Sequence, residues 1–143
     1  MRSRQAGFTL IEIMVVVVIL AILGAMVAPQ ILSRIDEARV TRAKTDLRLY
    51  ESALDMYRID NFRYPTTDQG LDALVHRPND SNLKNWRADG YVKQLMKDPW
   101  GHDYVYLAAP TGGAAYDIMS LGADGQVGGT GLDADISLRD LGK

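Results

Sequence analysis

The sequence predicts an α+β protein in which one long N-terminal α-helix precedes a small antiparallel β-sheet head. An apolar run without a charged side chain spans residues 13–33, and apolar residues then recur at helical intervals to about residue 60. Beyond residue 100, two short segments rich in Tyr, Val and Ile flank a turn that contains Pro and Gly. That pattern is typical of a β-hairpin.

Length and charge exclude several classes of protein. The chain has 143 residues, enough for one small domain besides the apolar segment. Its 16 basic and 18 acidic side chains give a net charge of -2, so nucleic acid is not expected as a partner. The chain contains no Cys, which excludes a disulfide framework, a Cys-ligated metal and a thiol nucleophile.

The apolar run predicts a membrane-spanning helix over residues 8–28. The stretch from Phe8 to Val27 is long enough, at about 1.5 Å per residue, to cross a hydrocarbon core of roughly 30 Å. A buried core helix is the alternative. The remaining chain is too polar to cover such a helix on every side, so membrane insertion is the better interpretation.

The residues before the apolar run indicate its orientation. Arg2 and Arg4 are the charged side chains of the first seven residues. Basic residues favour the cytoplasmic side, so the polar C-terminal part is expected across the membrane. A secretory signal peptide is a poor match, because its apolar core is usually shorter and ends at a small-x-small site. Here Met26, which is not small, stands two places before Ala28.

One acid, Glu12, interrupts the apolar character of this segment. A charged side chain in a bilayer is costly, by about 3 kcal/mol near its centre, and it usually has a partner. Glu12 either lies close enough to the headgroups to reach water or meets a cation that arrives on assembly. The residues alone favour neither interpretation.

The helix is expected to continue as an amphipathic segment over residues 29–61. Its apolar positions recur along one side and alternate with charged residues. They are Ile31, Ile35, Ala38, Leu47, Tyr50, Leu54 and Tyr57. Pro29 lacks a donor and Gly24 has low helix propensity, so a kink or local melting is expected there.

Residues 62–143 are expected to form a globular head. A short helix should follow Thr67 or Asp68 as its cap, with Leu71, Leu74 and Val75 on its inner face. The strands of the hairpin are expected over residues 104–107 and 115–121, joined through residues 110–113.

The C-terminal part of the head combines acids with glycines. Asp124, Asp133 and Asp135 lie within twelve residues that also contain four glycines. Calcium binds six to eight hard oxygen ligands, which such a loop can supply. Asp and Gly are also common in solvated turns, and the residues alone favour that simpler interpretation.

No arrangement typical of an enzyme is visible in the sequence. The two histidines, His76 and His102, lie in unrelated segments, and a catalytic base must meet a positioned partner. Motifs for a nucleophile elbow, a phosphate-binding loop or a zinc protease do not occur. A surface or turn-supporting role is therefore expected for both histidines, and the protein is not expected to be an enzyme.

The segment from Gly7 to Glu12 reads Gly-Phe-Thr-Leu-Ile-Glu, after a short basic leader and before an apolar run. It resembles the class III signal of the type IV pilin and pseudopilin superfamily. The resemblance implies a pilin-like fold and a leader peptide over residues 1–7. It also implies that a prepilin peptidase cleaves between Gly7 and Phe8 and N-methylates Phe8. Glu12 would then pair with the amino terminus of Phe8 in a neighbouring subunit.

Three further segments resemble the major pseudopilins of type II secretion systems. They are Tyr64-Pro65-Thr66 with Gly70-Leu71, Asp98-Pro99-Trp100-Gly101, and Ser120-Leu121-Gly122-Ala123-Asp124-Gly125. The resemblance implies a homopolymer, the periplasmic pseudopilus, which exports folded proteins across the outer membrane. It also implies an inner-membrane location with a single span and a periplasmic head. The partners implied are minor pseudopilins, the prepilin peptidase and the inner-membrane secretion platform.

The same resemblance implies a calcium ion in the C-terminal loop. It assigns Asp124 and Asp135 as side-chain ligands, Asp133 as a further ligand, and the carbonyl of Leu121 as a backbone ligand. The family often has an acidic residue after Gly129, where this chain reads Thr-Gly-Leu.

Two alternative functions stay open at this point. One is a subunit of a surface type IV pilus, although many true pilins have a C-terminal cysteine pair that this chain lacks. The other is a membrane-anchored periplasmic binding domain that does not polymerise.

Overall fold

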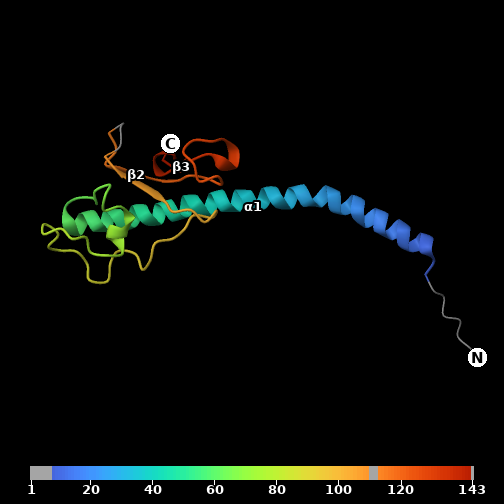
Figure 1. Cartoon of the computed structure of the whole chain (residues 1–143), viewed down its shortest axis with the longest axis horizontal. Helices are drawn as coiled ribbons and strands as arrows, with labels where there is room; N and C mark the ends of the chain where they lie inside the picture. Colours follow the sequence, from blue (N-terminus) through green and yellow to red (C-terminus); the bar gives the residue numbers. More distant parts are fainter. Residues whose placement is uncertain (1–7, 110–112, 143) are drawn as a thin grey trace, which may run out of the picture. The chain divides into compact units, whose positions relative to one another are not determined.

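The computed structural model describes residues 8–109 and 113–142, with the side chains of all of these except 28–30 (Figure 1). In chain order its elements are α1 (Leu10–Asn61), η1 (Leu71–Leu74), β1 (Val105–Ala108), β2 (Tyr116–Ser120), η2 (Gly131–Asp133), β3 (Ile136–Ser137) and η3 (Leu138–Asp140). The contacts divide the chain into two compact units, and the division follows Glu37 within α1. The predicted α+β class is confirmed.

In the first unit, α1 is helical from Leu10 onward and stays so through Gly24 and Pro29. Of the expected kink or local melting at these residues, local melting is therefore wrong, and the kink stays a prediction. Proline removes a single backbone donor, and the turns on either side keep their own hydrogen bonds. α1 ends at Asn61, close to the expected end.

In the second unit, the rest of α1 packs on the sheet. Leu47, Tyr50, Leu54 and Tyr57 recur at intervals of three and four residues and are buried. In Figure 1, β2 and β3 lie alongside this half of the helix. The buried cluster also contains Ala53, Leu71, Ala73, Leu74, Leu83, Tyr104, Tyr106 and Ile118. The predicted inner face of the helix is thus confirmed from Leu47 to Tyr57, whereas Ile31, Ile35 and Ala38 are exposed.

The sheet has three antiparallel strands in the order β1-β2-β3. Val105 pairs with Met119 and Ala108 with Tyr116, which confirms the predicted hairpin with slightly shifted ends. Residues 110–112 of its expected turn lie outside the described residues. The sequence did not predict β3, because a strand of two residues has no alternation to recognise.

The predicted cap of the short helix is wrong. The residue before η1 is Gly70, which has a φ of 57° and gives no side-chain cap. Capping occurs one turn earlier, where the Thr66 amide donates to Gln69 Oε1 at 2.9 Å and Thr66 Oγ1 accepts from the Gln69 amide at 3.2 Å. The positive φ of Gly70 separates that turn from η1, so Thr67 and Asp68 do not lie at a helix N-terminus.

Polar contacts hold the irregular segment between η1 and β1 against the core. Tyr50 Oη accepts from the Met96 amide at 2.8 Å, and Trp86 Nε1 donates to the Ala73 carbonyl at 2.9 Å. Arg63 forms an ion pair with Asp80. These contacts fix the segment that leads into the Asp98 turn.

Candidate assembly helix and calcium loop

The first turn of α1 contains a reciprocal cap between Thr9 and Glu12. The Thr9 amide and Thr9 Oγ1 donate to Glu12 Oε2 at 2.8 and 3.0 Å, and Thr9 Oγ1 accepts from the Glu12 amide at 3.3 Å. This is the capping box, in which two backbone donors that lack helical partners are satisfied. It explains why the helix begins at Leu10, and it fixes the Glu12 carboxylate at the helix N-terminus.

Phe8 lies beside this cap. Its side chain is 84% exposed, and Phe8 and Glu12 line one open hollow with Ile11, Ile13, Val15 and Val16. The structure thus brings the two predicted assembly residues to one apolar surface of a single chain. Gly7, on the other side of the predicted cleavage point, lies outside the described residues.

The apolar residues that follow, up to Val27, are exposed in the part of the chain that the structure describes. Helix α1 is long and apolar enough to cross a membrane, and its most apolar 18-residue window is 0% buried. A soluble monomer rarely exposes so large a continuous apolar surface. This half of the helix therefore needs an apolar surrounding, which a lipid bilayer or further copies of the helix can supply.

The C-terminal loop closes through backbone contacts. The Ala123 amide donates to the Leu132 carbonyl at 2.9 Å, and the Asp135 amide donates to the Gly128 carbonyl at 3.2 Å. Gly122, with a φ of 67°, comes so close to Asp133 that a Cβ atom there would lie 2.7 Å from the Asp133 carbonyl carbon. The beginning and the end of the loop are therefore held together, and a glycine is required at that approach.

The three predicted carboxylates have different surroundings. Asp124 is exposed, and its Oδ1 accepts from the Gln126 amide at 3.0 Å. Asp133 is exposed. Asp135 is half-buried, and its Oδ2 accepts from the Gly128 amide at 2.9 Å. Within the described part of the chain, the carboxylates are not gathered into a group of three that could hold a metal ion.

One oxygen of Asp135 does suit a cation. Asp135 Oδ1 is buried and has no hydrogen-bond partner among residues 8–109 and 113–142. An unsatisfied buried acceptor costs about 1–3 kcal/mol, and more when it carries charge. Calcium would satisfy it, and calcium also accepts backbone carbonyls such as that of Leu121. Of the predicted ligands, Asp135 is therefore the one whose surroundings suit a cation, while Asp124 and Asp133 lie exposed on the loop.

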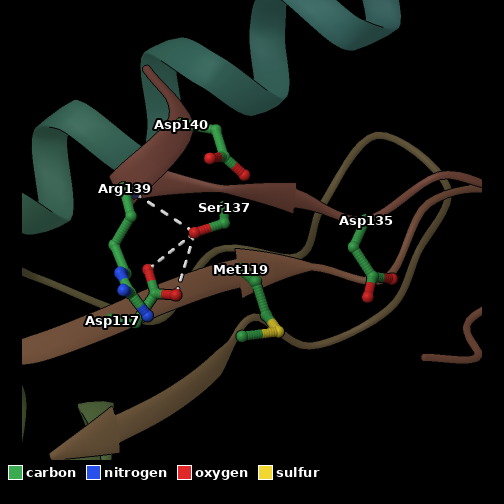
Figure 2. Close-up of a pocket in the computed structure, with 6 residues that line it drawn as sticks. All are labelled: Asp117, Met119, Asp135, Ser137, Arg139 and Asp140. Carbon is green, nitrogen blue, oxygen red and sulfur yellow. Dashed lines mark hydrogen bonds between the residues drawn. The ribbon is translucent and has the colours of Figure 1, made fainter. Parts of the chain in front are cut away.

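Asp135 also lines a pocket that was not predicted from the sequence, together with Asp117, Met119, Ser137, Arg139 and Asp140 (Figure 2). Ser137 Oγ lies 2.8 and 2.9 Å from the two oxygens of Asp117, which is only 4% exposed, and it accepts from the Arg139 amide at 3.2 Å. The Ile118 amide also donates to Asp117. A single acid within a short strand carries no sequence signal, because its partner is twenty residues away.

The histidines occupy supporting positions. His76 Nδ1 lies 2.8 Å from Asp72 Oδ1 on the exposed surface, and His102 Nδ1 lies 3.1 Å from the Gly122 carbonyl. His102 is thus a neighbour of the C-terminal loop. This contact was not predicted, since the two residues are far apart in the sequence.

Comparison with known proteins agrees with this arrangement. The family model described as type II secretion system (T2SS), protein G matches residues 30–139, and the model of the prokaryotic N-terminal methylation motif matches residues 2–28. The type II secretion system core protein G of Pseudomonas aeruginosa is 59% identical over 136 residues, covering 94% of this chain and 95% of its own length. The core protein G of Vibrio cholerae is 53% identical and covers 93% and 90% respectively.

A solved structure is similar as well. The crystal structure of the major pseudopilin from the type 2 secretion system of enterohaemorrhagic Escherichia coli has a TM-score of 0.64 and 44% identity. The match covers 74% of this chain and 90% of that one. The chain therefore belongs to the type II secretion system protein G family and is a structural pseudopilin subunit rather than an enzyme.

Proposed function

We propose that this chain is processed between Gly7 and Phe8 by the prepilin peptidase and polymerises into the periplasmic pseudopilus that helps to export folded proteins across the outer membrane. Before assembly it spans the inner membrane once, with its head in the periplasm. The observation that carries the proposal is the exposed apolar half of α1, residues 10–27, which lies within the segment that matches the methylation motif. Minor pseudopilins and the inner-membrane secretion platform are its expected partners.

The apolar half of α1 is covered first by lipid and, after assembly, by protein. In the bilayer, lipid covers it. In the polymer, the same helices of neighbouring copies replace the lipid, so the apolar surface stays out of water throughout. Repeated head-to-tail contacts between identical subunits generate a helical filament because they do not close into a ring.

Glu12 selects the register of that polymer. The carboxylate, already fixed by Thr9, meets the methylated amino group of Phe8 in a neighbouring copy. Both charges leave water together, and a subunit in the wrong register would leave a buried charge unpaired. Such an unpaired charge costs about 3–5 kcal/mol.

Calcium stabilises the head. The C-terminal loop has no disulfide to hold it, and the buried oxygen of Asp135 needs a positive partner. Asp135, Asp124 and the Leu121 carbonyl would hold the ion, with Asp133 as a further ligand. An ion that binds only the folded head adds to its stability by mass action.

Two measurements test the proposed function. Mass spectrometry of the protein isolated from membranes should give a mature chain that begins at N-methyl-Phe8. The same protein from cells without the prepilin peptidase should keep residues 1–7. Deletion of the gene should stop the secretion of folded proteins without removing surface pili, and a mature chain that begins elsewhere would refute the processing step.

A further inference from the structure

A buried carboxylate outside the predicted calcium ligands holds the beginning of the C-terminal loop. Asp98 is 3% exposed. Its Oδ1 accepts from the Trp100 amide at 3.1 Å and from the His102 amide at 2.8 Å, within its own turn. Its Oδ2 accepts from Ser120 Oγ at 2.6 Å, a short bond of the kind that an ionised acceptor forms.

Ser120 carries this contact to the loop. It is fully buried at the end of β2, directly before Leu121. While its Oγ donates to Asp98, the same atom accepts from the Gly122 amide at 3.3 Å. Hydrogen bonds therefore link Asp98 to Ser120 and Ser120 to Gly122, so the residues on both sides of Leu121 are held in place. The carbonyl of Leu121 is the one assigned to calcium.

The same turn makes a second contact with the loop through His102. Its Nδ1 lies 3.1 Å from the Gly122 carbonyl. At Gly125, a Cβ atom would lie 2.9 Å from His102 Nε2, so the ring lies directly against the loop backbone. The Asp98 turn therefore supports both sides of the segment that contains Leu121 and Asp124.

The chemistry explains why an acid is needed at this position. An asparagine could accept the two backbone hydrogen bonds of the turn with its single carbonyl oxygen. Its amide group would then face Ser120 as a donor and could not accept from the Ser120 hydroxyl. A buried carboxylate is costly unless its oxygens have partners. The second oxygen of Asp98 accepts from Ser120 Oγ and also lies 3.8 Å from His102 Nδ1 of the same turn.

We infer that Asp98 and Ser120 are positioning residues of the calcium loop, which fix the backbone at Leu121 and Gly122 before the ion binds. The inference rests on the calcium site proposed above. Neighbours that orient metal ligands typically change metal affinity about 10- to 100-fold when they are removed. A loop that is fixed in advance also binds more tightly, because less chain entropy is lost on binding.

The test uses the full mature protein in detergent micelles, stripped of metal with a chelator and titrated with calcium chloride in a calorimeter. Ser120→Ala should raise the Kd for calcium by about 10- to 100-fold. In the metal-free protein it should also speed hydrogen exchange of the Gly122 amide, because that amide loses its acceptor. Asp98→Asn, which keeps size and turn capping, should change both quantities in the same direction.

Tyr104→Phe is the matched control. It removes another buried hydroxyl, which donates to Asp46 Oδ2 at 3.0 Å and belongs to the core rather than to the loop. Its calcium Kd should equal that of the wild type. If Ser120→Ala and Asp98→Asn bind calcium as the wild type does, the inference is wrong and the calcium site stands. If the wild-type protein does not bind calcium, the proposed calcium site and the inference about Asp98 and Ser120 are both wrong.

Discussion

Thr9 and Glu12 satisfy each other's hydrogen-bonding groups at the start of α1, with Glu12 Oε2 lying 2.8 Å from the Thr9 nitrogen and 3.0 Å from Thr9 Oγ1. The acid therefore has a role within one chain before a neighbour arrives. It caps the N-terminus of the helix and lines the same hollow as Phe8. Capping and pairing between subunits are separate roles, and different substitutions separate them.

Glu12→Gln distinguishes the two roles. Glutamine can replace glutamate in a capping box, so the helix start should persist, but it carries no charge to meet a neighbour's amino group. We expect the variant to insert into the membrane normally and to form no filaments, with secretion reduced to the level of a deletion strain. Membrane fractionation, electron microscopy of sheared filaments and a secretion assay measure these outcomes.

Glu12→Ala is the companion variant, since it removes both roles. It should fail in assembly as completely as Glu12→Gln does. Normal filaments from Glu12→Gln together with none from Glu12→Ala would show that capping, not charge pairing, is the function of this acid.

Removal of calcium should destabilise the head. At a free calcium concentration of 100 times its Kd, the ion adds about 2.7 kcal/mol to the free energy of unfolding. A chelator should therefore lower the melting temperature of the full mature protein in micelles, as circular dichroism would show. Asp135→Asn should abolish most of this calcium response, because the buried oxygen loses its charge.

Asp68→Asn is the control for that experiment, because Asp68 is an exposed acid outside the loop. It should respond to calcium as the wild type does. An identical melting temperature with calcium and with chelator in the wild-type protein would count against the site.

The packing of α1 on the sheet predicts a large effect at Leu54. This side chain is fully buried, and truncation to alanine should leave a cavity that costs about 2–5 kcal/mol. Leu49→Ala on the same helix is the matched control, since Leu49 is 52% exposed and should cost far less. Urea unfolding in micelles measures both, and equal midpoints for the two variants would contradict the assigned helix face.

Alkaline pH should unfold the head through its buried tyrosines. Burial, reinforced by the hydrogen bond to Asp46, raises the pKa of Tyr104 far above its ordinary value of 10.0. Above pH 10 the unfolded chain loses this proton while the folded chain keeps it, so stability falls as pH rises. Burial raises the pKa of Tyr106 and Tyr116 in the same direction.

Tyr104→Phe should reduce this loss, because phenylalanine has no proton to release. The variant should be less stable than the wild type at neutral pH, where it lacks the hydrogen bond to Asp46. Its free energy of unfolding should then fall less steeply above pH 10, the ordinary pKa of the removed group. Equal slopes for the two proteins would show that Tyr104 does not contribute to the alkaline transition.

The amino-acid sequence predicts the structure best where a pattern repeats along the chain. The uncharged run from residue 13 to residue 33 predicts the exposed apolar helix, and the spacing of Leu47, Tyr50, Leu54 and Tyr57 predicts the buried face. The predicted cap of the short helix is wrong because its position depends on the backbone conformation of a single residue. Thr67 and Asp68 are ordinary capping residues, but the positive φ of Gly70 moved the cap to Thr66.

The sequence by itself determined the long helix, the hairpin and the family, because each depends on spacing or on a contiguous motif. Only the tertiary structure decided which acids are buried and which groups they form hydrogen bonds with. Asp98 accepts a hydrogen bond from Ser120, Asp117 accepts one from Ser137, and Asp135 has one oxygen without a partner among the residues that the structure describes. The members of each pair are about twenty residues apart, so no periodic signal links them. Their contact follows from the antiparallel pairing of the strands and from the turn before β1.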